Sequence, residues 1–103
     1  MTEYVLVLTT FPEEGADTLA IALVEERLAA CVNVLEPMRS IYRWKGRVET
    51  SVERQVLIKT KAANVPTLET RIKELHPYDL PEFLVLAIES GNHAYLAWLG
   101  DSS

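Results

Sequence analysis

Two apolar runs near the ends of the chain constrain its fold most strongly. Residues 4–8 and 83–88 are apolar at every position, as strands buried on both faces are. An antiparallel strand with one face in water alternates apolar and polar side chains instead. The chain therefore needs a cover for both faces of its sheet, and its length limits what can supply that cover.

A chain of 103 residues predicts a single domain over residues 1–103. Hydrophobic residues make up 49% of it against 24% charged residues, which favours a packed core over disorder. The expected elements are a strand at 4–10, a helix from Pro12 to about Ala30, strands at 31–35, 40–44 and 48–60, a helix at 65–75, a strand at 83–88 and a short helix closed by Gly100.

The pair Lys45 and Gly46 predicts a two-residue turn, because glycine supplies the positive φ that such turns need. Strand partners around this turn then have numbers that sum to 91, so Tyr42 lies opposite Glu49. Pro37 interrupts the first part of the hairpin and predicts a bulge that changes this count further back.

The order β-α-β-β-α-β followed by a small helix predicts an α+β fold. It is a ferredoxin-like βαββαβ sandwich with a long hairpin between its second and third strands and a short C-terminal helix. Right-handed crossovers place both long helices on one face of the sheet, so the other apolar face stays uncovered. The sequence therefore predicts self-association, with the hairpin that carries Tyr42 and Trp44 as an arm.

Charge and cysteine content exclude several classes of protein. Ten Lys and Arg against fifteen Asp and Glu give a net charge of −5 with no basic stripe, which argues against a nucleic-acid partner. The single Cys31 excludes an internal disulfide and a cysteine-rich zinc site. Met1–Tyr4 shows no signal-peptide pattern and the apolar runs are too short to cross a bilayer, so we expect a cytoplasmic protein without a membrane partner.

Five motifs in order along the chain resemble the CutA family of divalent-cation tolerance proteins. They are LVEERLAACVN at 23–33, SIYRWKG at 40–46, IKT at 58–60, HPYDLPE at 76–82 and YLAWL at 95–99. The resemblance covers nearly the whole chain. It implies a homotrimer, assembled through hairpin arms and similar in architecture to PII signalling proteins, with a role in tolerance to copper and other divalent metals. Because no catalytic constellation is visible, we expect a non-enzymatic protein that either binds metal weakly or transmits a signal.

Some members of that family are described as binding copper through a cysteine at the end of the first strand and two adjacent histidines before Pro-Tyr. Thr9, Leu75 and His76 stand at those positions here, so only one of the three ligands is present. Copper and zinc sites collect three or four nitrogen or sulfur ligands. We therefore expect no obligatory cofactor, and only weak coordination of copper or another divalent cation by His76.

Two alternatives to the metal role remain open. The first is a PII-like sensor that binds a small anionic metabolite in a cleft between subunits. Lys59 supports it, because an ammonium beside an apolar run needs a partner such as Glu82 or a bound anion. The second is an enzyme with Cys31 as nucleophile and His76 as base, although no catalytic motif is visible. The predicted cleft residues are Cys31, Asn33, Trp44, Lys59, Glu82 and Tyr95.

Overall fold

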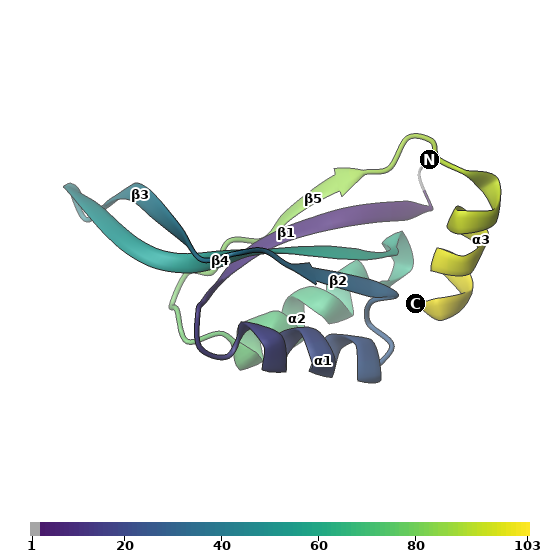
Figure 1. Ribbon diagram of the computed structural model, residues 1–103, viewed down its shortest axis with the longest axis horizontal. Coiled ribbons are helices and arrows are strands. Elements are labelled where there is room, and N and C mark those ends of the chain that lie inside the picture. Colours follow the sequence, from purple (N-terminus) through teal and green to yellow (C-terminus); the bar gives the residue numbers. More distant parts are fainter. Residues whose placement is uncertain (1–2) are drawn as a thin grey trace.

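The computed structural model describes residues 3–103 and contains five strands and three α-helices within that range (Figure 1). Met1 and Thr2, on which part of the signal-peptide prediction rests, lie outside the described residues. The elements are β1 (Tyr4–Pro12), α1 (Ala16–Glu25), β2 (Cys31–Val34), β3 (Met38–Trp44), β4 (Arg47–Lys61), the 3₁₀ turn η1 (Ala62–Asn64), α2 (Val65–Leu75), β5 (Leu84–Ala87) and α3 (His93–Ser102).

The sheet is antiparallel throughout and has the strand order β2-β4-β1-β5, with β3 also paired to β4. This order confirms the predicted ferredoxin-like arrangement. Figure 1 shows α1 and α2 on one side of the sheet, α3 at one end, and the β3–β4 hairpin projecting from the other end. We call this hairpin, residues 38–53, the arm.

Helices α1 and α2 cover one face of the sheet and form the hydrophobic core with it. Alternate residues of β1 and β4 point into this core, and Val7 and Ile58 are fully buried there. The steps of three and four that predicted α2 bring Leu68 and Ile72 onto the same core. We call this side of the sheet the covered face.

The first helix begins later than predicted. Pro12 continues β1 and lies opposite Glu53, and α1 starts only after Gly15, whose φ is 99°. A proline is tolerated at this point because β5 pairs only with the beginning of β1, from Val5 to Leu8, so the end of β1 has a free edge. The prediction of a helix start at Pro12 is therefore wrong.

The first helix also ends earlier than the predicted Ala30. Arg27 adopts a left-handed conformation with φ 58°, and the amides of Arg27 and Leu28 bond to the carbonyls of Val24 and Leu23. This pattern is a Schellman motif, which stops a helix and is most often built with glycine. Because arginine occupies this position instead of glycine, the sequence gives no signal for the end of the helix.

The last helix was predicted to end at Gly100. It continues to Ser102 instead. A Cβ at Gly100 would lie 3.1 Å from the Tyr4 ring, so glycine allows the helix to approach β1 closely. The helix begins at Asn92, whose side-chain oxygen accepts a hydrogen bond from the Tyr95 amide at 2.9 Å.

The predicted hairpin register is confirmed. Lys45 and Gly46 have φ values of 51° and 78°, and Tyr42 lies opposite Glu49. Beyond the interruption at residues 35–37, the partners sum to 90 instead of 91, as for Cys31 and Lys59. The offset comes from residues 35–37, and β4 itself is uninterrupted, so its odd-numbered residues lie on one continuous face from Lys59 to the arm.

The face of the sheet opposite the two helices keeps a large apolar surface, and we call it the open face. Leu84 and Leu86 of β5 are 52% and 45% exposed and continue the row of Leu8 and Leu6 from β1. On the arm, Ile41, Val48 and Val52 are also more than half exposed, but by strand alternation they continue the side of the sheet that carries Ile58. Among residues 3–103, no helix is long and apolar enough to cross a membrane.

Candidate functional site

Three of the predicted cleft residues share the open face. Cys31 lies directly opposite Lys59, and Asn33 lies two residues further along the same face of β2. Leu6 flanks Lys59 on its other side. The sheet therefore brings Cys31, Asn33 and Lys59 together on a partly exposed and mostly apolar surface.

Lys59 makes no ion pair with any residue in the described range 3–103. Glu82 was predicted as one possible partner, but its carboxylate accepts a hydrogen bond from Gln55 Nε2 at 3.0 Å. Gln55 and Lys59 are four residues apart on one strand, or roughly 13 Å. The ammonium group of Lys59 is thus left available on the open face.

Glu82 is also held in place by a contact with Thr9 of β1. Its carbonyl accepts a hydrogen bond from Thr9 Oγ1 at 2.6 Å, and the same Gln55 Nε2 that donates to its carboxylate also donates to the Thr9 carbonyl at 2.7 Å. Thr9 is fully buried, so these bonds satisfy polar groups inside the molecule. Together they fix the segment of residues 77–82 against the sheet.

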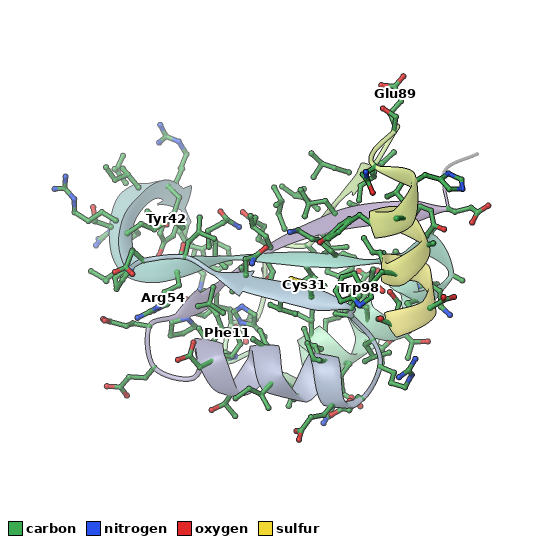
Figure 2. The ribbon with its side chains drawn as sticks, turned by 45° about the vertical axis from the view of Figure 1, so that its right-hand side comes forward. Phe11, Cys31, Tyr42, Arg54, Glu89 and Trp98 are labelled. Carbon is green, nitrogen blue, oxygen red and sulfur yellow. The ribbon has the colours of Figure 1, made fainter. Side chains whose placement is uncertain are left out.

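A groove with a volume of about 760 Å³ lies between the arm and residues 77–82, and we call it the arm groove. Trp44 and Glu82 line it, as do Tyr42 and Ser51, whose hydroxyl groups are 2.7 Å apart. Figure 2 shows Tyr42 and Arg54 on opposite sides of the arm, as the alternation of strand residues requires. Apart from Ile41, the arm residues that line the groove lie on the same side as Tyr42.

Glu53 and Tyr78 form the inner wall of the arm groove. Tyr78 Oη donates a hydrogen bond to Glu53 Oε2 at 3.1 Å, and Glu53 is only 7% exposed. Burial of the phenol, together with its bond to the Glu53 carboxylate, raises the pKa of Tyr78 to about 12. Tyr78 therefore remains a hydrogen-bond donor at neutral pH.

His76 lies buried behind this wall, and both of its ring nitrogens have partners. Nε2 is 2.6 Å from the Thr10 carbonyl, to which it donates, and Nδ1 accepts from the Tyr78 amide at 3.1 Å. The ring also packs edge-on against Phe11, with centroids 4.7 Å apart. Coordination of a metal through Nδ1 would have to replace the bond from Tyr78.

Metal binding and nucleophilic catalysis have no assembled site in the described chain. Among residues 3–103, no three His, Cys, Asp or Glu side chains are placed to hold a metal ion. Cys31 is a free, partly exposed thiol, and the hydrogen bonds of His76 go to Thr10 and Tyr78 instead of to it. The thiol and the imidazole predicted as nucleophile and base are therefore not hydrogen-bonded to each other.

Tyr95 lies on α3, away from the other predicted cleft residues. Its ring is 43% exposed and packs against Trp98 with centroids 5.4 Å apart. In one chain the predicted cleft thus falls into three groups, on the open face, in the arm groove and on α3. Trp44 pairs with Arg47 of β4. Arg47 and Lys59 are twelve residues apart on that strand, or roughly 40 Å.

The comparisons with known proteins agree on one family. The sequence model described as "CutA1 divalent ion tolerance protein" matches residues 5–102. This chain belongs to the CutA1 family. The divalent-cation tolerance protein CutA of Thermus thermophilus is 48% identical over 101 residues, which make up 98% of each chain.

Solved CutA structures have the same fold as this chain. The divalent cation tolerance protein CutA1 from Thermus thermophilus superposes with a TM-score of 0.94 at 50% identity, over 97% of this chain and 98% of that one. The protein described as PII-like protein CutA from Nostoc sp. PCC 7120 gives a TM-score of 0.90 at 37% identity, over 95% of both chains. The predicted CutA resemblance and the ferredoxin-like fold are both confirmed.

Glu53, Tyr78 and the arm groove itself were not among the predicted site residues. One signal was present, because the predicted register places Glu53 on the same face of the arm as Tyr42. The other wall depends on residues 77–82, which are joined to β1 through contacts such as that between Thr9 and Glu82, 73 residues apart. No local pattern indicates such a contact.

Proposed function

We propose that this CutA1 chain is the subunit of a homotrimer that contributes to tolerance of copper and other divalent cations without catalysing a reaction. The observation that carries the self-association is the open face. Leu84 and Leu86 are about half exposed on β5, and a row of apolar side chains of this size is typical of a protein interface. The family resemblance implies that the assembly has three subunits.

The geometry of the predicted cleft adds support for the assembly. Cys31 and Lys59 lie far along β4 from Trp44, so a single chain cannot close one cleft around all of them. A second copy could bring its open face to the arm of the first. In this arrangement the cleft is formed between subunits.

Light scattering on the purified chain at micromolar concentration tests the assembly. The expected mass is three times the 11.6 kDa of one chain. A mass of one chain would overturn the proposed trimer, and with it the shared cleft.

Calorimetry with copper or zinc tests the metal role. We expect weak, saturable binding that is reduced further in His76→Ala, because His76 is the one family ligand that this chain retains. His93→Ala is the matched control, since His93 is an exposed histidine at the start of α3. Binding that is absent, or equally weakened in both variants, would contradict a ligand role for His76.

A second candidate function is a PII-like sensor that binds a small anion at the open face. The observation that favours it is Lys59, an ammonium on an apolar surface without an ion-pair partner among residues 3–103. Titration with inorganic phosphate and with ATP tests it. Lys59→Ala should lose binding, whereas Lys61→Ala, two residues along the same face, should keep it. Equal binding by both variants would contradict the sensor.

A further inference from the structure

The arm leaves the sheet at Glu53. On β4, Glu53 lies opposite Pro12, the last residue of β1, and on its other side opposite Met38, the first residue of β3. Further out, β3 is the only strand among residues 3–103 that pairs with β4. The arm is therefore a two-stranded ribbon that joins the wider sheet at the row of Glu53.

Such a ribbon does not fix its own direction. Two strands alone are marginally stable, and they twist more strongly than a wide sheet does. Figure 1 shows the arm projecting beyond α1 and α2, so the hydrophobic core of the chain does not support it. Contacts at the base of the arm must therefore set its direction relative to the sheet.

Tyr78 supplies a contact of this kind from a distant part of the chain. Its hydroxyl group donates a hydrogen bond at 3.1 Å to Oε2 of Glu53, 25 residues away in sequence. Glu53 is only 7% exposed, and a hydrogen bond to a carboxylate is stronger than one between neutral groups. This bond ties the row at which the arm begins to residues 77–82.

Tyr78 is fixed in turn to β1 through His76. The Tyr78 amide donates to Nδ1 of His76 at 3.1 Å, and the two rings pack with centroids 4.6 Å apart. Nε2 of His76 donates to the Thr10 carbonyl of β1 at 2.6 Å, and both of these residues are buried. A continuous set of bonds thus runs from β1 through His76 and Tyr78 to the base of the arm.

The contact on the other side of β4 does not do the same. Arg54 points to that side, where its Nη1 donates to the Leu35 carbonyl at 3.3 Å. Leu35 belongs to the segment that leads into β3, and its amide bonds to the Gln55 carbonyl of β4. This contact joins the base of the arm to β4 itself, whereas Tyr78 joins it to a separate part of the fold.

We propose that His76, Tyr78 and Glu53 form a brace that holds the arm in the direction in which it meets a second subunit. Association costs free energy when it has to order a mobile segment, and a segment already ordered by folding avoids that cost. The role in association rests on the proposed homotrimer, whereas the direction of the arm within one chain does not. The brace lies inside the chain and needs no free surface.

Hydrogen exchange of the backbone amides tests the brace in Tyr78→Phe, which keeps the ring beside His76 and removes only the hydroxyl group. Amides of residues 38–53 should exchange roughly five- to tenfold faster, because one hydrogen bond to a carboxylate is lost. Amides of β1 and α2 should keep their rates. Tyr95→Phe is the matched control, since Tyr95 is 43% exposed against 38% for Tyr78 and lies on α3.

Variants of Glu53 separate positioning from general stability. Glu53→Ala removes the acceptor and should speed exchange of the arm as much as Tyr78→Phe does. Glu53→Gln keeps a side-chain oxygen that can accept from the phenol, so it should restore most of the protection. The double variant Tyr78→Phe/Glu53→Ala should exchange no faster than the single variants, because both changes break the same bond.

Light scattering over a dilution series tests the role in association. Tyr78→Phe should weaken association roughly severalfold, whereas Tyr95→Phe serves as the control for loss of a hydroxyl group. If the unmodified chain is a monomer at every concentration, the proposed trimer fails and the role in association fails with it. The exchange experiment still decides whether the brace holds the arm.

Three outcomes would overturn the brace. They are equal exchange of the arm in Tyr78→Phe and the unmodified chain, an equal increase in Tyr95→Phe, and a uniform increase over the whole chain. A faster-exchanging arm with unchanged association of a trimer would overturn the role in association.

Discussion

Leu57 and Ile58 are neighbours on β4 with side chains of the same composition, yet they lie on opposite faces of the sheet. Ile58 is fully buried beneath α1 and α2, whereas Leu57 is only partly buried on the open face beside Asn33. The same contrast holds along β1, where Val7 is fully buried and Leu8 only partly. Both faces carry apolar side chains on these two strands, but their burial differs.

This contrast shows what two helices can do for a sheet that is apolar on both sides. They bury the centre of one face, on β1 and β4, and leave the apolar side chains of the other face partly exposed. Residues on the covered face should therefore determine whether the chain folds. Residues on the open face should determine how it associates.

The strongest test of the comparison is the pair Ile58→Ala and Leu57→Ala. Ile58→Ala should lower the free energy of unfolding by about 2–5 kcal/mol, because it leaves a cavity in a closed core. Leu57→Ala should cost less in dilute solution, and its cost should rise with protein concentration if the open face is an interface. Urea denaturation at two protein concentrations measures both effects. Equal and concentration-independent losses would contradict the division between the faces.

A smaller effect is expected at the boundary between the covered face and the arm groove. His76→Phe keeps a ring beside Phe11 but removes both hydrogen bonds of the imidazole and leaves the buried Thr10 carbonyl without its donor. The expected loss is about 1–3 kcal/mol in the free energy of unfolding. Chemical denaturation checks it, and an unchanged stability would show that these bonds are not structural.

On the open face, Leu86→Ala should weaken association by about 1 kcal/mol while the fold is kept. Ile21→Ala is the matched control, because Ile21 is 60% exposed on α1, on the helix side of the molecule. Light scattering over a dilution series measures the association of each variant. If Ile21→Ala weakens association as much as Leu86→Ala does, the interface is not confined to the open face.

The smallest effect concerns the helix layer itself, where Arg71 on α2 contacts Glu26 at the end of α1 at 2.8 Å. The hydrogen bond from Arg71 lowers the pKa of Glu26 below its usual 4.5. The pair therefore stabilises the fold above that pH and loses its contribution as the pH falls below it.

Glu26→Gln should accordingly lower the melting temperature slightly at neutral pH, and the difference from the unmodified chain should vanish in acid. Melting curves between about pH 3 and 7 check this, with Glu25→Gln as control. A difference that persists at low pH would mean that the contribution of the ion pair is not electrostatic.

Much of the fold could be predicted because its signals are local. The turn at Lys45 and Gly46 sets the register of the whole arm, and the spacing of Leu68 and Ile72 defines α2. The bounds of α1 could not be predicted in the same way. Its end depends on a left-handed arginine, a conformation that no pattern in the sequence indicates.

The candidate site was less predictable than the fold. Alternation along the strands is enough to place Cys31 and Asn33 on one face, because side chains in a strand point to the two sides in turn. The arm groove depends on how residues 77–82 return to the sheet, through contacts such as that of Thr9 with Glu82. Such contacts join segments far apart in sequence, and only the folded chain shows them.

The left-handed backbone at Arg27 has a consequence for the other end of the chain. This conformation costs a residue with a side chain about 1–2 kcal/mol, a strain that glycine would avoid. In return, the guanidinium group of Arg27 donates a hydrogen bond to the Asp101 carbonyl of α3 at 2.9 Å. A glycine at position 27 would relax the backbone but would lose this hydrogen bond. One residue therefore both ends the first helix and holds the last helix against it.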